Sequence, residues 1–197
     1  MSDAIDYYFT APSPFTYLGH NTLMSIAAKH GKTVNFKPFN IMGVWENSGA
    51  EPPMKRPPVR QRYRLLDIKR AGVMRDTCIN AEPKFFPTNP TPADLVICAL
   101  ILAGENPTGF TFAIGQAIWS NEKQIADDDI LLEVLSSCGH DAQKILDLSK
   151  TDDAAELREK NTQEAIAADA VGAPAYVYQG EVFWGQDRLE YLSLIHI

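Results

Sequence analysis

The sequence predicts an α/β fold in which an all-helical segment interrupts a small sheet. Three observations support this prediction. The first forty residues alternate strand, helix and strand, the middle of the chain shows helical patterns without a strand, and two short strands and a helix close the chain. The predicted order is therefore β-α-β, a helical insertion, and β-β-α. A β-α-β unit normally joins parallel strands through a right-handed crossover.

The first unit is defined by two strand patterns and the helix between them. Residues 4–10 are rich in aromatic and β-branched side chains, and residues 33–39 alternate in polarity, as strands do. Residues 15–30 place their apolar side chains largely on one helical face. Ser13 followed by Pro14 is typical of a helix N-cap with proline at the first helical position.

The middle of the chain is predicted to be helical after an initial loop. Residues 45–58 contain four prolines together with asparagine, serine and glycine, a composition that favours a loop. Helical patterns then follow one another at residues 60–72, 92–104, 109–120, 128–138, 141–148 and 152–171.

The last part of the chain returns to strands. Residues 175–178 and 182–184 predict two strands, and the Gln-Gly-Glu sequence at residues 179–181 predicts the hairpin that joins them. Asp187 follows a glycine turn and can cap a final helix that runs through Leu194.

These elements predict a split sheet domain. We assign residues 1–44 and 172–197 to it, and residues 45–171 to the helical insertion, whose last helix, at about 152–171, leads back into the sheet domain. The ending at residues 193–197 is unlike a helix terminus, and a shortened sequence is one interpretation of it.

Composition excludes several classes of protein. The 197 residues are 45% hydrophobic, which is enough to bury a core without metals or disulfides. The net charge of -7 argues against a general nucleic-acid binder. No apolar run approaches the ~20 residues of a membrane span, and the start lacks the features of a signal peptide. Three cysteines without a Cys-x-x-Cys pair fit a reducing cytoplasm.

The charge is unevenly distributed. Residues 55–75 carry eight basic side chains and one acidic side chain. One interpretation is a solvated helix face, which is the ordinary role of such a stretch. The alternative is a site for a small ligand that carries carboxylates.

Ser13 is the first candidate for chemistry, because it lies where a strand ends and a helix begins. Backbone N–H groups in the first helical turn have no partner within the helix, and the helix dipole adds partial positive charge. A thiolate, carboxylate or phosphate is stabilised at such a point, and the serine hydroxyl can also donate to it. Local sequence alone favours the plainer role of an N-cap.

Two further candidates lie near the end of the chain. A cis Ala173-Pro174 bond would expose the backbone of Ala173 as an edge that can pair with a peptide-like ligand. Asp187 either caps the final helix, which local sequence favours, or binds an ammonium group of a ligand. The sequence contains no HExxH zinc spacing, no GxSxG, no P-loop and no dinucleotide fingerprint, so we predict no metal site.

Five segments together resemble a known family: YFTAPSPFTYL (8–18), RQRY (60–63), AIWS (117–120), GAP (172–174) and FWGQDRL (183–189). Over essentially the whole chain the sequence resembles the 2-hydroxychromene-2-carboxylate isomerases. These belong to the DsbA-like branch of the thioredoxin superfamily and are related to the kappa-class glutathione transferases. The resemblance implies a thioredoxin-like fold with an all-helical domain inserted in the middle.

The resemblance also implies glutathione as cofactor and assigns it a site. Redox members of the superfamily carry a Cys-x-x-Cys pair where this chain has residues 13–16, which contain no sulfur. Exchange by an internal cysteine pair is therefore excluded, because no thiolate is present there to attack. In the family, the serine that matches Ser13 holds the glutathione thiolate. Ala173 and Pro174 match the cis-proline signature whose preceding residue pairs with the glutathione backbone.

Three more residues are carried over from the family as glutathione ligands. Gln186 and Asp187 match positions that hold the γ-glutamyl end. Arg60 lies near a basic residue of the family, about one position offset, and would pair with a glutathione carboxylate. The chain departs from the kappa-class pattern at Ala50, where the family has a ligand-binding asparagine, so that contact is not expected.

The implied reaction is a glutathione-dependent isomerisation of an aromatic carboxylate. The thiolate adds to the ring-opened acid, a former double bond rotates, and elimination regenerates the thiolate. The substrate pocket should lie between the sheet domain and the helical insertion, with Phe86 and Trp119 as lining residues or, equally, as ordinary core. Relatives of this kind imply a cytoplasmic homodimer without membrane or nucleic-acid partners.

Three alternatives remain at this point. A kappa-type glutathione transferase or peroxidase would share the glutathione half of the site and differ in the acceptor pocket. A non-catalytic glutathione- or peptide-binding member of the fold would bind without turnover. A disulfide oxidoreductase is disfavoured because the cysteine pair is missing.

Overall fold

The computed structural model describes residues 3–195 and contains one four-stranded sheet in the order β2-β1-β3-β4. Strands β1 (Ala4–Phe9) and β2 (Thr33–Pro38) are parallel, as the β-α-β pattern predicts. Strands β3 (Ala175–Tyr178) and β4 (Glu181–Trp184) form the predicted hairpin, with β3 antiparallel to β1. Its two-residue turn has positive φ at both positions, as hairpin turns that match the twist of the strands require.

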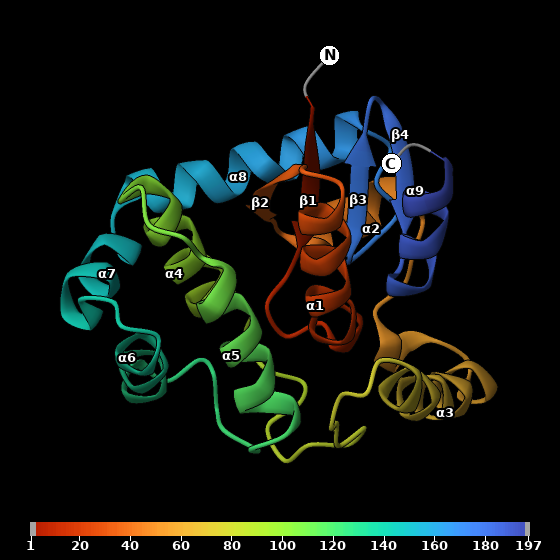
Figure 1. Ribbon diagram of the computed structural model, residues 1–197. Helices are drawn as coiled ribbons and strands as arrows, with labels where there is room; N and C mark the ends of the chain where they lie inside the picture. Colours follow the sequence, from red (N-terminus) through yellow and green to blue (C-terminus); the bar gives the residue numbers. More distant parts are fainter. Residues whose placement is uncertain (1–2, 196–197) are drawn as a thin grey trace.

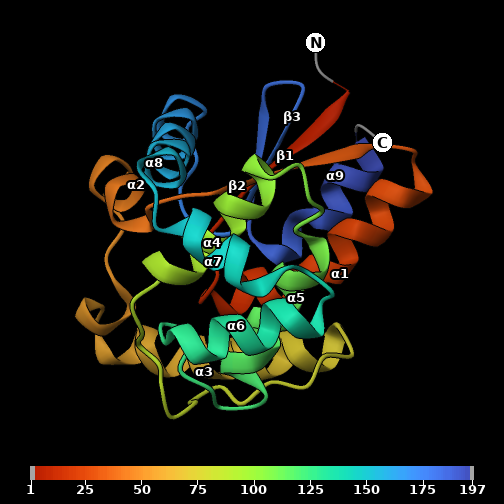
Figure 2. The same cartoon turned by 90° about the vertical axis from the view of Figure 1, so that its left-hand side faces the viewer.

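Helices cover both faces of the sheet (Figures 1 and 2). Helices α1 (Pro14–Lys29) and α9 (Leu189–Ile195) lie on one face, and α2 (Ile41–Ser48) and α8 (Asp152–Ala167) lie on the other. The side chains of β1 alternate between these layers. Tyr7 belongs to the large core on the α1 side, and its neighbour Tyr8 to the smaller core beneath α2 and α8.

The helical insertion continues from the sheet domain without a break in packing. Helices α4 (Thr91–Leu102), α5 (Thr108–Trp119), α6 (Asp128–Ser137) and α7 (Ala142–Ser149) pack on one another, and α5 also packs on α1. Helix α3 (Pro58–Met74) lies apart from this group and packs chiefly against α1. The expected fold class is confirmed, whereas the division at residues 44 and 172 remains a prediction.

One local prediction was wrong. Residues 45–58 are not all loop, because α2 extends to Ser48 and a short 3-10 turn forms at Pro53–Lys55. The Asn40 side chain accepts a hydrogen bond from the Met42 N–H and caps α2. Ile41 and Val44 are buried in the core beneath α2. This tertiary burial stabilises a helix of eight residues that is too short to be marked by its periodicity.

The final helix also begins differently from the prediction. Residues Gln186–Arg188 form a short 3-10 turn, and α9 starts at Leu189. Asp187 makes no capping hydrogen bond there, and its carboxylate lies 2.6 Å from the guanidinium of Arg188. The last two residues of the ending that drew attention in the sequence, 196–197, lie outside the described part of the chain.

Within residues 3–195, no helix is both long enough and apolar enough to cross a membrane.

Candidate functional site

The C-terminal ends of β1, β2 and β4 lie beside the N-terminal end of β3 at one end of the sheet. Ser13 follows β1 at this end. Ser13 has extended backbone angles and caps α1, and its Oγ accepts a hydrogen bond from the Thr16 N–H at 3.3 Å. The same hydroxyl is 3.5 Å from the carbonyl oxygen of Ala173, to which it donates. The fold therefore brings together two predicted site residues that are 160 positions apart.

The Ala173-Pro174 bond is cis. The carbonyl oxygen of Pro174 accepts a hydrogen bond from the Gly185 N–H at 2.9 Å. Gly185 has a φ of 105°, and a Cβ at this position would lie 2.5 Å from a carboxylate oxygen of Asp187. The segment before β3 is thus held between the Ser13 hydroxyl on one side and the turn after β4 on the other.

Ser13 and Ala173 open onto a cleft of about 480 Å³, hereafter the cleft. Gln186 and Asp187 also line it, as does Phe86. Much of the remaining wall is apolar and comes from α2, the loop that follows it, and β4, through Ile41, Met42, Trp45, Met54 and Trp184.

Two arginines give the cleft its charge. The guanidinium of Arg56 lies 5.9 Å from the ring centroid of Trp45, and that of Arg64 lies 5.4 Å from the ring centroid of Phe86. Among the described residues, no carboxylate forms an ion pair with either one. Burial, together with the nearby charge of Arg56, lowers the pKa of Arg64 to about 10. Asp67 lines the same cleft and Glu51 lies near enough to act on Arg56, but neither carboxylate forms an ion pair with these two arginines. Two partly desolvated cations that are not ion-paired favour an anionic ligand.

Arg60 lies beside the cleft instead of in it. Its side chain is exposed on α3 and lines a neighbouring depression of about 360 Å³. That depression shares Phe15, Arg56, Arg64 and Asp67 with the cleft. An anion held by Arg60 would therefore lie at the outer end of the cleft.

Trp119 belongs to the core. It is fully buried and is not among the residues that line the cleft. Its ring packs behind Phe86, with the centroids 4.9 Å apart. Of the two aromatic residues considered from sequence, Phe86 therefore faces the cleft and Trp119 supports it from within. The Phe86-Pro87 bond is also cis, which the sequence did not indicate.

Gln186 is buried and already has a partner. Its side-chain oxygen accepts from Nε of Arg75 at 2.6 Å, and its carbonyl accepts from Nη2 of the same arginine at 2.6 Å. Arg75 also pairs with Glu190 of α9. One arginine of the basic stretch is thus used to fix the turn after β4, and it is not available to a ligand.

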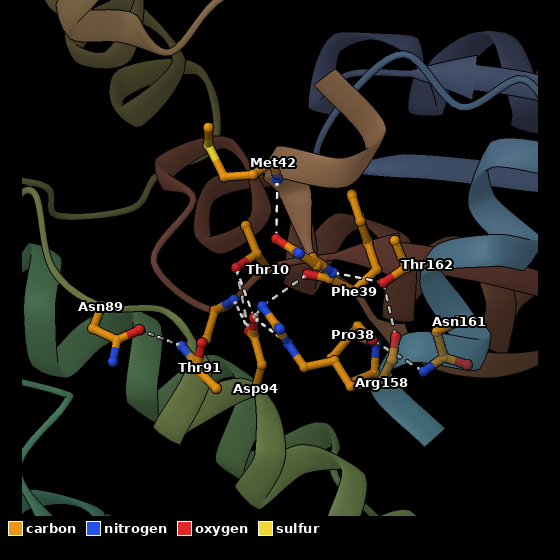
Figure 3. Close-up of polar contacts among 12 residues, drawn as sticks. Thr10, Pro38, Phe39, Met42, Asn89, Thr91, Asp94, Arg158, Asn161 and Thr162 are labelled. Carbon is orange, nitrogen blue, oxygen red and sulfur yellow. Dashed lines mark hydrogen bonds and ion pairs between the residues drawn. The ribbon is translucent and has the colours of Figure 1, made fainter. Parts of the chain in front are cut away.

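Sequence reasoning missed a buried carboxylate near Ser13. Asp94, in the first turn of α4, is fully buried and accepts hydrogen bonds from the Ala11 N–H and from the Thr10 hydroxyl (Figure 3). Burial raises the pKa of Asp94 to about 6, although the charge of Arg158 opposes this effect. An aspartate in the first turn of a helix is so common that it gave no separate signal.

Within residues 3–195, histidine, cysteine, aspartate and glutamate form no group of three or more that could hold a metal ion.

Comparison with known proteins places the whole chain among characterised relatives. The family model described as DSBA-like thioredoxin domain matches residues 4–194. The chain is 27% identical to the 2-hydroxychromene-2-carboxylate isomerase of Sphingobium xenophagum, over 98% of this chain and 97% of that protein. It is 26% identical to glutathione S-transferase kappa 1 of Caenorhabditis elegans, over 96% and 88% of the two chains.

The fold is also found among solved structures. A structure of a 2-hydroxychromene-2-carboxylate isomerase matches with a TM-score of 0.80 and 20% identity, covering 96% of this chain and 92% of that chain. At this identity the likeness shows the fold.

Proposed function

The chain belongs to the DSBA-like thioredoxin domain family, and from this premise we propose that it is a glutathione-dependent isomerase of aromatic carboxylates similar to 2-hydroxychromene-2-carboxylate. The names of the relatives support both parts of the proposal, one being an isomerase of that acid and another a glutathione transferase. The observation that carries it is the placement of Ser13, at a helix N-terminus and opposite a cis-proline segment, in a cleft that also holds Arg56 and Arg64.

Ser13 is proposed to bind the sulfur of glutathione as a thiolate. A cysteine thiol has a pKa of about 8.5 and is mostly protonated near pH 7. A thiolate at the start of α1 would face the positive end of the helix, and the Ser13 hydroxyl would donate to it. The proton of that hydroxyl now makes a long bond of 3.5 Å to Ala173, so little is lost when it turns to the sulfur. Each unit by which the thiol pKa falls corresponds to ~1.4 kcal/mol of preference for the thiolate.

The rest of the tripeptide would extend along the segment that precedes β3 and the turn that follows β4. The backbone of Ala173, next to Pro174, would pair with the cysteinyl main chain. Asp187 would hold the ammonium of the γ-glutamyl end, and the side-chain amide group of Gln186 would donate to its carboxylate. Arg60 would bind the glycine carboxylate at the outer end of the cleft.

The aromatic substrate would occupy the apolar part of the cleft. Phe86 lines this space, and Met42 and Trp45 lie on its α2 side. Arg64, whose guanidinium lies over the Phe86 ring, would bind the substrate carboxylate. We propose no contact for Trp119, whose role is to support Phe86.

The bound thiolate would then carry out the isomerisation. It adds to a conjugated carbon of the ring-opened acid, which forms a C–S bond and converts a double bond into a single bond. The single bond rotates, and elimination breaks the C–S bond, restores the double bond and returns the thiolate. Glutathione is regenerated, and no oxidant or reductant is consumed.

A kappa-type transferase or peroxidase is the second candidate. The relative named glutathione S-transferase kappa 1 favours it, and it would use the same residues for glutathione. The two functions differ in the acceptor. A non-catalytic glutathione-binding protein would keep the binding residues and show no turnover. A homodimer in the cytoplasm remains part of the proposal.

The test is an assay of the purified protein with two acceptors. We expect conversion of 2-hydroxychromene-2-carboxylate that requires added glutathione and leaves its concentration unchanged. An electrophilic aromatic halide serves as the second acceptor. Faster consumption of glutathione with the halide, and no conversion of the chromene acid, would replace the isomerase with the transferase. Binding of glutathione without turnover of either acceptor would leave only the binding function.

A further inference from the structure

The turn that carries Ser13, residues 10–13 and hereafter the Ser13 turn, is tied to the helical insertion by one carboxylate. Asp94 of α4 accepts from the Ala11 N–H at 2.8 Å through Oδ1, and from the Thr10 hydroxyl at 3.3 Å through Oδ1 and at 3.0 Å through Oδ2. The Thr10 carbonyl in turn accepts from the Ser13 N–H at 3.1 Å. The position of Ser13 therefore depends on a side chain 81 residues away.

Arg158 of α8 completes the arrangement. It donates to Oδ2 of Asp94 from Nε at 3.2 Å and from Nη2 at 3.0 Å, and its Nη2 also lies 3.5 Å from the Phe39 carbonyl. Figure 3 shows the arginine between the carboxylate of Asp94 and the chain that follows β2. The guanidinium thus links the Ser13 turn with the segment that leads into α2.

The next residues of α8 hold that segment as well. Asn161 donates to the Pro38 carbonyl at 3.0 Å, and the Thr162 hydroxyl accepts from the Asn40 N–H at 2.9 Å. Asn40 caps α2, and α2 carries Trp45 into the wall of the cleft. One face of α8 is therefore bonded to the start of α2, and Asp94 connects this face to Ser13 (Figure 3).

We propose that Asp94 and Arg158 are positioning residues, which use the helical insertion to hold the Ser13 hydroxyl at a fixed place relative to the α2 wall of the cleft. Neither residue lines the cleft, so neither touches glutathione or substrate. The part of the proposal that concerns the sulfur rests on the proposed function. The part that concerns the position of the Ser13 turn does not depend on the proposed function.

The geometry of the Asp94 carboxylate identifies a substitution that tests its positioning role. Oδ1 of Asp94 accepts from the Ala11 N–H, whereas Oδ2 accepts from Arg158 and from the Thr10 hydroxyl. An asparagine has one carbonyl oxygen and one NH2 group at these positions, so it can accept on one side only. Asp94→Asn therefore keeps the shape of the side chain. Its carbonyl oxygen should stay toward the charged Arg158, which donates twice to this side, so the NH2 group faces Ala11 and that hydrogen bond is lost.

The experiment compares Asp94→Asn with wild type and with Ser149→Ala. Ser149 is also a buried polar residue, but its hydroxyl bonds only within α7. Two quantities are measured, namely the hydrogen exchange of the Ala11 amide without ligand, and the pKa of the thiol of bound glutathione from thiolate absorbance. In Asp94→Asn we expect Ala11 exchange to accelerate about 10-fold, as loss of one hydrogen bond to a charged group implies, and the thiol pKa to rise by about 1 unit.

The two readouts separate the inference from the proposed function. If wild type does not bind glutathione, the proposed function fails, and exchange of Ala11 still decides whether Asp94 holds the Ser13 turn. A folded Asp94→Asn protein with wild-type exchange at Ala11 overturns the inference. Faster exchange with an unchanged thiol pKa reduces Asp94 to a structural residue and also overturns it. The Ser149→Ala protein should match wild type in both quantities.

A second pair of variants covers the case in which Asp94→Asn does not fold. Thr10→Val removes the hydroxyl that contacts both oxygens of Asp94 and keeps the volume of the side chain, whereas Thr10→Ser keeps the hydroxyl. We expect the valine protein to show faster Ala11 exchange and a higher thiol pKa, and the serine protein to recover both. Equal behaviour of the two variants contradicts the inference.

Discussion

The two sides of the cleft are constructed in different ways. The Ser13 turn is buried and held by Asp94, Arg158 and the backbone. The α3 side packs chiefly against α1 and leaves apolar residues in solvent, with Val59 63% exposed and Tyr63 58% exposed. Its contribution to the cleft is the charged side chains of Arg64 and Asp67 rather than fixed hydrogen bonds.

This difference assigns the two tasks of the proposed enzyme to separate parts of the chain. Stabilising a thiolate requires donors held in place, because a site that shifts loses much of their effect. Choosing among aromatic acids requires surface and charge, which exposed helices can supply with less constraint. Substitutions near Asp94 should therefore alter stability and thiol chemistry, and substitutions on α3 should alter substrate affinity.

The largest effect should follow from breaking the buried ion pair. Arg158→Met leaves the fully buried Asp94 without its cation, and we expect the free energy of unfolding to fall by ~3–5 kcal/mol. Urea denaturation measures it. Arg62→Met, at an exposed position of α3, should change stability by no more than ~0.5 kcal/mol. A loss below ~1 kcal/mol for Arg158→Met would mean that the Ser13 turn is no more firmly held than α3.

The next effect concerns pH. Burial raises the pKa of Asp94 to about 6, so the folded protein binds more protons there than the unfolded chain between about pH 4 and 6, and this contribution to stability falls as pH rises. Burial lowers the pKa of His20 to about 4, so its contribution falls as pH decreases from about 6.5. Between about pH 4 and 6, the contributions of Asp94 and His20 to stability therefore change in opposite directions with pH.

Asp94→Asn removes one of these opposing contributions. Its free energy of unfolding should fall more steeply than that of wild type on acidification from about pH 6 to 4, by up to ~1.4 kcal/mol per pH unit. Urea midpoints across this range give the comparison. Parallel curves for the two proteins would show that Asp94 does not titrate in the window.

A smaller effect is expected on the α3 side. Arg64→Met keeps most of the side-chain volume and removes the charge over Phe86. We expect KM for the aromatic acid to rise about 10-fold, as loss of a charge-assisted contact implies, with kcat and the thiol pKa nearly unchanged. Steady-state kinetics measure this, with Arg62→Met as the control. A fall in kcat at constant KM would place Arg64 in the thiol half of the site.

The smallest effect is expected at Arg60. Because this side chain is exposed beside the cleft, Arg60→Met should raise KM for glutathione only about 2- to 3-fold, in keeping with a solvent-screened ion pair. Raising the salt concentration should produce a similar change in wild type. A 10-fold or larger rise would show that Arg60 reaches glutathione more closely than its place on α3 indicates.

Features with a local cause could be predicted from the sequence. The β-α-β unit, the hairpin and the helix patterns each have a signal within a few residues, and Ser13 before Pro14 marks the start of α1. The features that depend on distant contacts could not. Asp94 and Arg158 are 64 positions apart, and no periodicity relates them.

The basic stretch shows the same limit. Charge counting treats all its arginines alike, but the fold uses Arg75 to fix Gln186 and leaves Arg64 over Phe86 in the cleft. Trp119 could equally line a pocket or fill a core as far as sequence shows, and only the packing of α5 places it in the core.

The central claim is that this cleft stabilises the thiolate of glutathione through Ser13. Its most direct test is a pH titration of thiolate absorbance for glutathione bound to wild type and to Ser13→Ala. We predict a thiol pKa at least ~1 unit below the ordinary value of about 8.5 in wild type, and a return toward that value in Ser13→Ala. A bound thiol that titrates near 8.5 in wild type, or equally low in both proteins, would contradict the account.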